Sequence, residues 1–99
     1  MEIEITVIEA YELIQNAKDL QVVDLRDPEE FDKSSIKGSV NIPFNELSAE
    51  LGDFDGRKRT LLLDANGSKS HQAKALLDAC GYVSTVVRGG YDDWLSIIG

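Results

Sequence analysis

An acidic side chain follows a short apolar run in the middle of this 99-residue chain. Residues 60–63, Thr-Leu-Leu-Leu, have the pattern of a buried strand, and Asp64 leads from them into a short polar loop that opens a helix. Backbone N–H groups converge in such a strand-to-helix loop, and the helix dipole adds roughly half a positive charge. The loop therefore favours an anion. Because Asp64 is attached to its rim, we expect its carboxylate to be a built-in counter-anion that stiffens the loop and is itself favoured in the ionised form.

Two other roles for Asp64 stay open at this stage. The side chain could simply cap the helix that follows. It could also be a phosphoryl acceptor, because enzymes that form an aspartyl phosphate place the residue after a buried strand. Such enzymes hold Mg²⁺ with further carboxylates. Asn66 stands where a second aspartate would be expected, although Asp24 could approach from the end of a neighbouring strand.

Further polar residues lie where they could support the loop. Asp24 ends an apolar run, and the carboxyl ends of parallel strands are where ligands bind. Arg26 and Glu30 are four residues apart, which predicts an ion pair that holds the loop. His71, in the first turn after the loop, is expected to be a solvated surface residue, with a proton-donor role as the alternative. Ser68 and Lys69 could contact a ligand anion if Asp64 swung aside.

Short apolar runs alternate with helical patterns, which predicts an α/β fold with a mainly parallel sheet. The strands are expected at residues 3–5, 21–25, 39–42, 60–63 and 85–87. Thr6 and Glu9 form a capping box before a helix with Val7, Ala10, Leu13, Ile14 and Ala17 on its apolar face. Asn45 or Ser48 is expected to cap a small helix that Gly52 ends. The helix after residue 70 should bury Ala73, Leu76, Leu77 and Cys80, with Gly81 as its C-cap.

The last part of the chain carries glycines and aromatic residues that we assign to structure. Gly89-Gly90 lacks the third glycine of a dinucleotide-binding fingerprint and predicts a tight turn. It should lead into a final helix around Trp94, Ile97 and Ile98. Tyr82, Tyr91 and Trp94 are expected to pack in the core or in turns.

The amino-acid composition limits the classes of binding partner and the cell compartment that we expect for this chain. Acidic residues outnumber basic ones by 18 to 10, and the net charge of −8 disfavours nucleic acid and anionic membranes. Cys80 is the single cysteine, so no internal disulfide or cysteine-based metal site can form. The N-terminus lacks the features of a signal peptide. We therefore expect one domain, residues 1–99, in the cytoplasm, with no metal and no cofactor.

Nearly the whole chain resembles the rhodanese family. The matching segments are residues 22–31, 36–43, 64–70, 76–82 and 88–90, together with Trp94. The resemblance implies a three-layer α/β/α fold with a central, mainly parallel five-stranded sheet. In active relatives the loop after the central strand begins with a cysteine that carries a persulfide. Mapped onto this chain, that position is Asp64, the loop body is Ala65, Asn66, Gly67, Ser68 and Lys69, and Ser70 opens the helix. Lys69 stands where many members have arginine, which weakens the grip on a small anion.

An aspartate at this position argues against sulfur transfer. The reaction needs a polarizable thiolate, and a carboxylate offers hard oxygen. Cys80 lies ten residues further on, about 15 Å along a helix, and is expected to be a buried structural thiol. We therefore predict a non-catalytic binding or regulatory module whose partner is a protein with a basic patch. The alternative is an active sulfurtransferase that uses Cys80 or a thiol from a companion domain.

Overall fold

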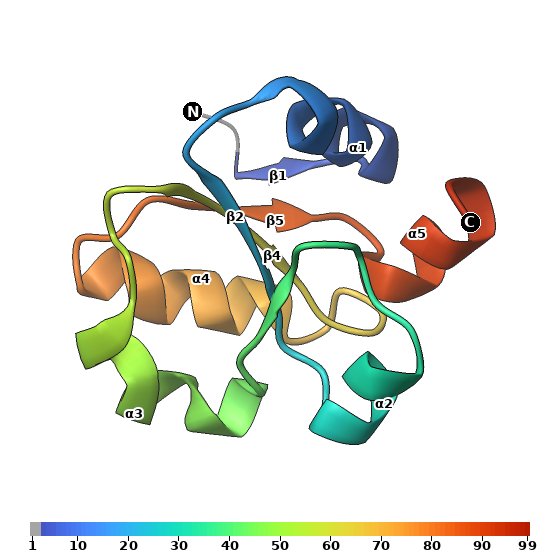
Figure 1. Ribbon diagram of the computed structural model, residues 1–99. Helices are drawn as coiled ribbons and strands as arrows, with labels where there is room; N and C mark the ends of the chain where they lie inside the picture. Colours follow the sequence, from blue (N-terminus) through green and yellow to red (C-terminus); the bar gives the residue numbers. More distant parts are fainter. Residues whose placement is uncertain (1–2) are drawn as a thin grey trace.

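Five strands form one parallel sheet in the order β1-β5-β4-β2-β3 (Figure 1). The computed structural model describes residues 3–99, apart from the side chain of Asp53. The strands are β1 (Glu4–Ile5), β2 (Leu20–Asp24), β3 (Val40–Asn41), β4 (Arg59–Leu63) and β5 (Ser84–Val87). Strand β4 is central, and Thr60, Leu61, Leu62 and Leu63 are completely buried. This confirms the prediction made from its unbroken apolar run.

Helices cover both faces of the sheet. They are α1 (Val7–Asn16), α2 (Pro28–Lys33), α3 (Leu47–Glu50), α4 (Ser70–Ala79) and α5 (Gly90–Ile97), with 3₁₀ turns at Phe44–Glu46 and Leu51–Asp53. One core cluster joins Leu61 and Leu63 to residues of α1 and α5, whereas a second joins Leu62 to residues of α3 and α4. Successive side chains of a strand point to opposite faces. The three-layer α/β/α architecture expected from the family resemblance is therefore confirmed.

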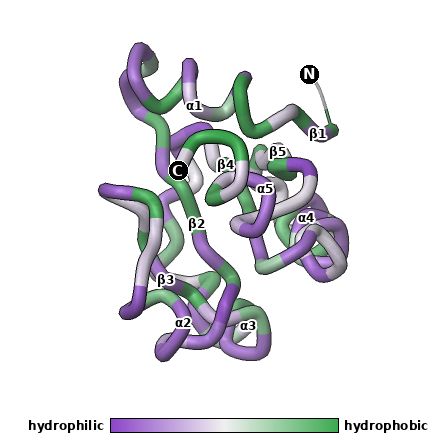
Figure 2. Tube along the Cα trace, turned by 90° about the vertical axis from the view of Figure 1, so that its right-hand side faces the viewer, coloured by the Kyte–Doolittle hydropathy of each residue, from purple (hydrophilic) through white to green (hydrophobic). Residues whose placement is uncertain are grey.

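Some helices begin and end where the sequence predicted, and others do not. Thr6 and Glu9 form the expected capping box. Neither Asn45 nor Ser48 caps the small helical segment, because a 3₁₀ turn already begins at Phe44 and leads directly into α3. Gly52 lies inside the next 3₁₀ turn and does not end the segment. Helix α2 has no buried residue and is mostly hydrophilic (Figure 2).

The expectation that Cys80 is buried is wrong. Helix α4 ends at Ala79, and Cys80 is its exposed C-cap. Gly81, with φ +82°, turns the chain here, and the N–H of Tyr82 donates to Leu77 O over 2.9 Å. As a result Tyr82, and not Cys80, packs against the core beside Leu77. The apolar stripe of α4 thus ends one turn earlier than its spacing suggested.

Candidate functional site

The Asp64 carboxylate lies within its own loop. Asp64 is 3% exposed, and its two carboxylate oxygens accept hydrogen bonds from the N–H groups of Gly67 and Lys69, each over 2.5 Å. The N–H of Ser68 donates to the Asn66 side-chain oxygen over 3.0 Å. Three consecutive N–H groups of the loop are thus bound by side chains of the loop itself. Asp64 does not occupy the N-cap of α4, because that position is Lys69.

The first residues of α5 are hydrogen-bonded to the backbone of the same loop. The N–H groups of Tyr91 and Asp92 donate to the carbonyl oxygens of Asp64 and Ala65 over 2.8 and 2.9 Å. Gly90 has φ +64°, and a Cβ at this position would lie 2.3 Å from Asp64 O. The sequence predicted a turn at Gly89-Gly90 but not this contact. No local signal marked it, since the two segments are more than twenty residues apart.

Gly90→Ala is therefore expected to destabilise the fold and displace the loop. Gly38→Ala is a matched control, because Gly38 also has positive φ, +84°, but a Cβ there would meet nothing within 4 Å. Backbone strain alone should lower the free energy of unfolding by about 1–2 kcal/mol in the control. We expect a larger loss for Gly90→Ala in urea unfolding, together with amide shifts at Ala65 and Gly67. Equal losses without loop shifts would mean that the contact with Asp64 O is unimportant.

Arg26 pairs with Asp24, and the predicted pair with Glu30 is not formed. The guanidinium donates through Nη2 to Asp24 Oδ2 over 2.8 Å and to Ser34 O over 2.7 Å. It also lies 3.9 Å from the centre of the Tyr91 ring. The Asp24 side chain is fully buried and the Arg26 side chain is 7% exposed. Arg26 folds back over Tyr91 to reach a carboxylate two residues earlier, which leaves Glu30 exposed on α2.

A cavity of about 230 Å³, which we call the loop cavity, opens between the Asp64 loop and the start of α2. Its lining consists of Leu25, Arg26, Asp27, Glu30, Asp64, Ala65, Asn66, Ser68 and Lys69. Most residues singled out in the sequence for the loop and its support therefore meet at one place. Asp24 lies beneath this site and supports it through Arg26.

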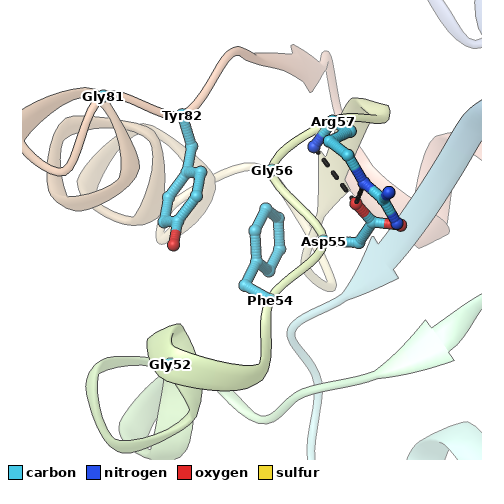
Figure 3. Close-up of a pocket in the computed structure, with 7 residues that line it drawn as sticks. All are labelled: Gly52, Phe54, Asp55, Gly56, Arg57, Gly81 and Tyr82. Carbon is cyan, nitrogen blue, oxygen red and sulfur yellow. Dashed lines mark hydrogen bonds and ion pairs between the residues drawn. The ribbon is translucent and has the colours of Figure 1, made fainter.

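A larger surface hollow lies elsewhere, beside the turn that follows α3. Gly52, Phe54, Asp55, Gly56, Arg57, Gly81 and Tyr82 line it (Figure 3). Asp55 and Arg57 pair at its edge, and hydrogen bonds from Arg57 lower the pKa of the Asp55 carboxyl. None of the candidate site residues contributes to this hollow.

The remaining candidates lie outside the loop cavity. His71 is exposed as expected, and its Nε2 lies 3.1 Å from the Glu4 carboxylate. Hydrogen bonds from Arg88 and then His71 lower the pKa of the Glu4 carboxyl. Ser70 is fully buried, and its Oγ has no partner among residues 3–99. Within the same residues no three His, Cys, Asp or Glu side chains group so that they could hold a metal ion, and no helix could cross a membrane.

Comparison with known proteins gives consistent matches. Residues 6–97 match the model of the rhodanese-like domain. Thiosulfate sulfurtransferase PspE of Escherichia coli is 30% identical over 73 residues, which cover 72% of this chain and 70% of that protein. The putative sulfur carrier protein YrkF of Bacillus subtilis is 24% identical over 82% of this chain, but this match spans 44% of its own length. The crystal structure of SSP1007 from Staphylococcus saprophyticus superposes with a TM-score of 0.86 at 31% identity, covering 95% of this chain and 93% of that one.

Proposed function

This chain belongs to the rhodanese-like family, and we propose that it works there as a non-catalytic binding or regulatory module. The observation that carries the proposal is the Asp64 carboxylate, bound by the N–H groups of Gly67 and Lys69. By the family resemblance, Asp64 stands where active members carry the cysteine persulfide. The loop then holds a carboxylate in place of a reactive sulfur.

A carboxylate cannot replace the missing thiolate. Sulfur transfer requires an atom that attacks a sulfane sulfur, holds it as a persulfide and then releases it. The Asp64 oxygens are hard and have no such chemistry. They also belong to a buried residue and already accept hydrogen bonds from the loop. The same proposal includes a protein partner with a basic surface, because the chain carries a net charge of −8.

The alternative is an active sulfurtransferase that uses another thiol. One observation favours it: Cys80 is exposed and therefore accessible to a sulfur donor. Against it stands the position of Cys80, at the opposite end of the ten-residue helix α4 from the loop. That separation is about 15 Å at a rise of 1.5 Å per residue. A thiol so far away would not use the N–H groups of the loop.

A thiosulfate assay with cyanide as acceptor tests the proposal. The native chain should release no thiocyanate above the rate in buffer, and Cys80→Ser should behave identically. Thiocyanate formation that is lost in Cys80→Ser would establish the alternative. Turnover that survives in Cys80→Ser would also overturn the proposal, because residues 1–99 contain no second cysteine.

A further inference from the structure

We propose that the loop cavity binds a cationic side chain of a protein partner, with arginine as the preferred group. This inference rests on the proposed function and identifies what the same site recognises. The cavity volume of about 230 Å³ is below the roughly 300–1,000 Å³ of typical small-molecule sites. A single inserted side chain therefore fits it better than a cofactor does.

The loop has little left to offer an external anion. The N–H groups of Gly67 and Lys69 already donate to the Asp64 carboxylate, and that of Ser68 donates to Asn66. An incoming oxyanion would have to displace an anion that is covalently attached to the loop. It would also meet the charge of Asp64 at close range. Three consecutive N–H groups that could stabilise an anion in a related protein are thus already used here.

The two basic residues that line the cavity are engaged as well. The guanidinium charge of Arg26 is balanced by the buried carboxylate of Asp24. The ammonium group of Lys69 lies 5.7 Å from the centre of the Phe44 ring, which is not part of the cavity lining. Lys69 is exposed, so water and salt screen its charge. Neither residue gives the cavity a strong, free positive charge.

The acidic residues at the mouth are free. Asp27 and Glu30 line the cavity, are exposed, and have no side-chain hydrogen bond or ion pair to any of the residues that the structure describes. Asp27 is the N-cap of α2 and Glu30 is the third residue of this helix, so both carboxylates belong to the start of α2 and both line the cavity. Two such carboxylates suit the planar fork of a guanidinium better than the point charge of an ammonium group. Three acidic residues (Asp27, Glu30 and Asp64) and two basic ones (Arg26 and Lys69) line the cavity, and this excess of negative charge also favours a cation.

Amide NMR titration of the full ¹⁵N-labelled chain tests this inference. The probe is the capped peptide Gly-Gly-Arg-Gly-Gly, with Gly-Gly-Gln-Gly-Gly as the uncharged control. A single charged side chain is expected to bind with a dissociation constant near 1 mM and to shift the amides of residues 27–30 and 65–69. Glu30→Gln should weaken binding by about two- to five-fold. Glu29→Gln is the matched control, because it removes the same charge from the same helix at a residue outside the lining.

Several results would overturn the inference. They are equal shifts with the glutamine peptide, equal weakening by Glu29→Gln and Glu30→Gln, and tighter binding of thiosulfate than of the arginine peptide. Spermidine distinguishes a protein side chain from a small polyamine as the source of the positive charge. If spermidine bound as tightly as the arginine peptide at the same amides, this would argue against a protein side chain. A peptide that fails to bind while the native chain stays inactive with thiosulfate contradicts this inference alone. Sulfur transfer by the native chain would instead contradict the proposed function.

Discussion

Replacing Asp64 with cysteine is expected to give a chain that takes one sulfur atom from thiosulfate, whereas the native chain takes none. The new thiolate would lie at the loop whose Gly67 and Lys69 N–H groups now hold the carboxylate. N–H groups and a helix N-terminus favour the thiolate form of cysteine. The thiolate attacks the sulfane sulfur, the sulfur–sulfur bond of thiosulfate breaks, and its electron pair leaves with sulfite. The product is a cysteine persulfide.

The measurement is the intact mass of the protein after incubation with thiosulfate. The change is made in a Cys80→Ser background, so that the exposed thiol at the end of α4 cannot contribute. Asp64→Ser in the same background is the matched control, because serine has nearly the size of cysteine and lacks sulfur. We expect a gain of one sulfur atom in most molecules of the cysteine variant and in none of the serine variant. Cyanide should then remove the added sulfur as thiocyanate and regenerate the thiolate.

A cysteine variant that gains no sulfur from thiosulfate would be equally informative. If its amide spectrum shows that residues 65–69 keep their native environment, the failure would mean that this loop does not stabilise a thiolate. The correspondence between Asp64 and the persulfide-carrying position would then lose its physical basis. If the native chain instead gained a sulfur atom, the sulfur would have to be carried by Cys80, its single cysteine.

Features set by neighbours in sequence could be predicted from the chain alone. The continuous apolar run of residues 60–63 placed β4 in the middle of the sheet, where both of its faces are buried. The spacing of Thr6 and Glu9 located the beginning of α1. The binding of the Asp64 carboxylate by N–H groups of its own loop could also be predicted locally, because a loop between a parallel strand and a helix positions its N–H groups by backbone geometry. Such features depend on a few consecutive residues.

Features that depend on tertiary contacts were missed or assigned wrongly. The spacing of Arg26 and Glu30 suggested a helical pair, but the packing of Arg26 on Tyr91 directs the guanidinium to Asp24. The contact of Gly90 with Asp64 O joins two segments that only the completed sheet brings together. Cys80 continued an apolar spacing, yet the turn at Gly81 placed it in solvent. In each case a distant residue or a change of chain direction decided the outcome.

Asp24→Asn is expected to lower the free energy of unfolding by about 3–5 kcal/mol, the usual cost of removing one partner of a buried ion pair. Asparagine has nearly the size of aspartate and keeps one side-chain oxygen. That oxygen can still accept the hydrogen bond from the backbone N–H of Arg26, which Asp24 Oδ1 accepts over 3.0 Å in the native chain. The Arg26 guanidinium, in a side chain 7% exposed, would lose its counter-charge. A desolvated cation without an anion accounts for most of the expected loss. The loop cavity should loosen with it, since Arg26 is part of its lining.

Urea unfolding of Asp24→Asn beside Asp78→Asn separates this effect from a general loss of charge. Asp78 pairs with Lys74 four residues earlier on α4 and has a side chain that is 52% exposed, so its removal should cost at most about 0.5 kcal/mol. Adding Arg26→Met to Asp24→Asn removes the unpaired cation while keeping a long apolar side chain. We expect this double variant to recover part of the lost stability, because the penalty arises from the buried charge. A double variant no more stable than Asp24→Asn would show that packing and the hydrogen bonds of Arg26 to Ser34, and not charge, hold this part of the site together.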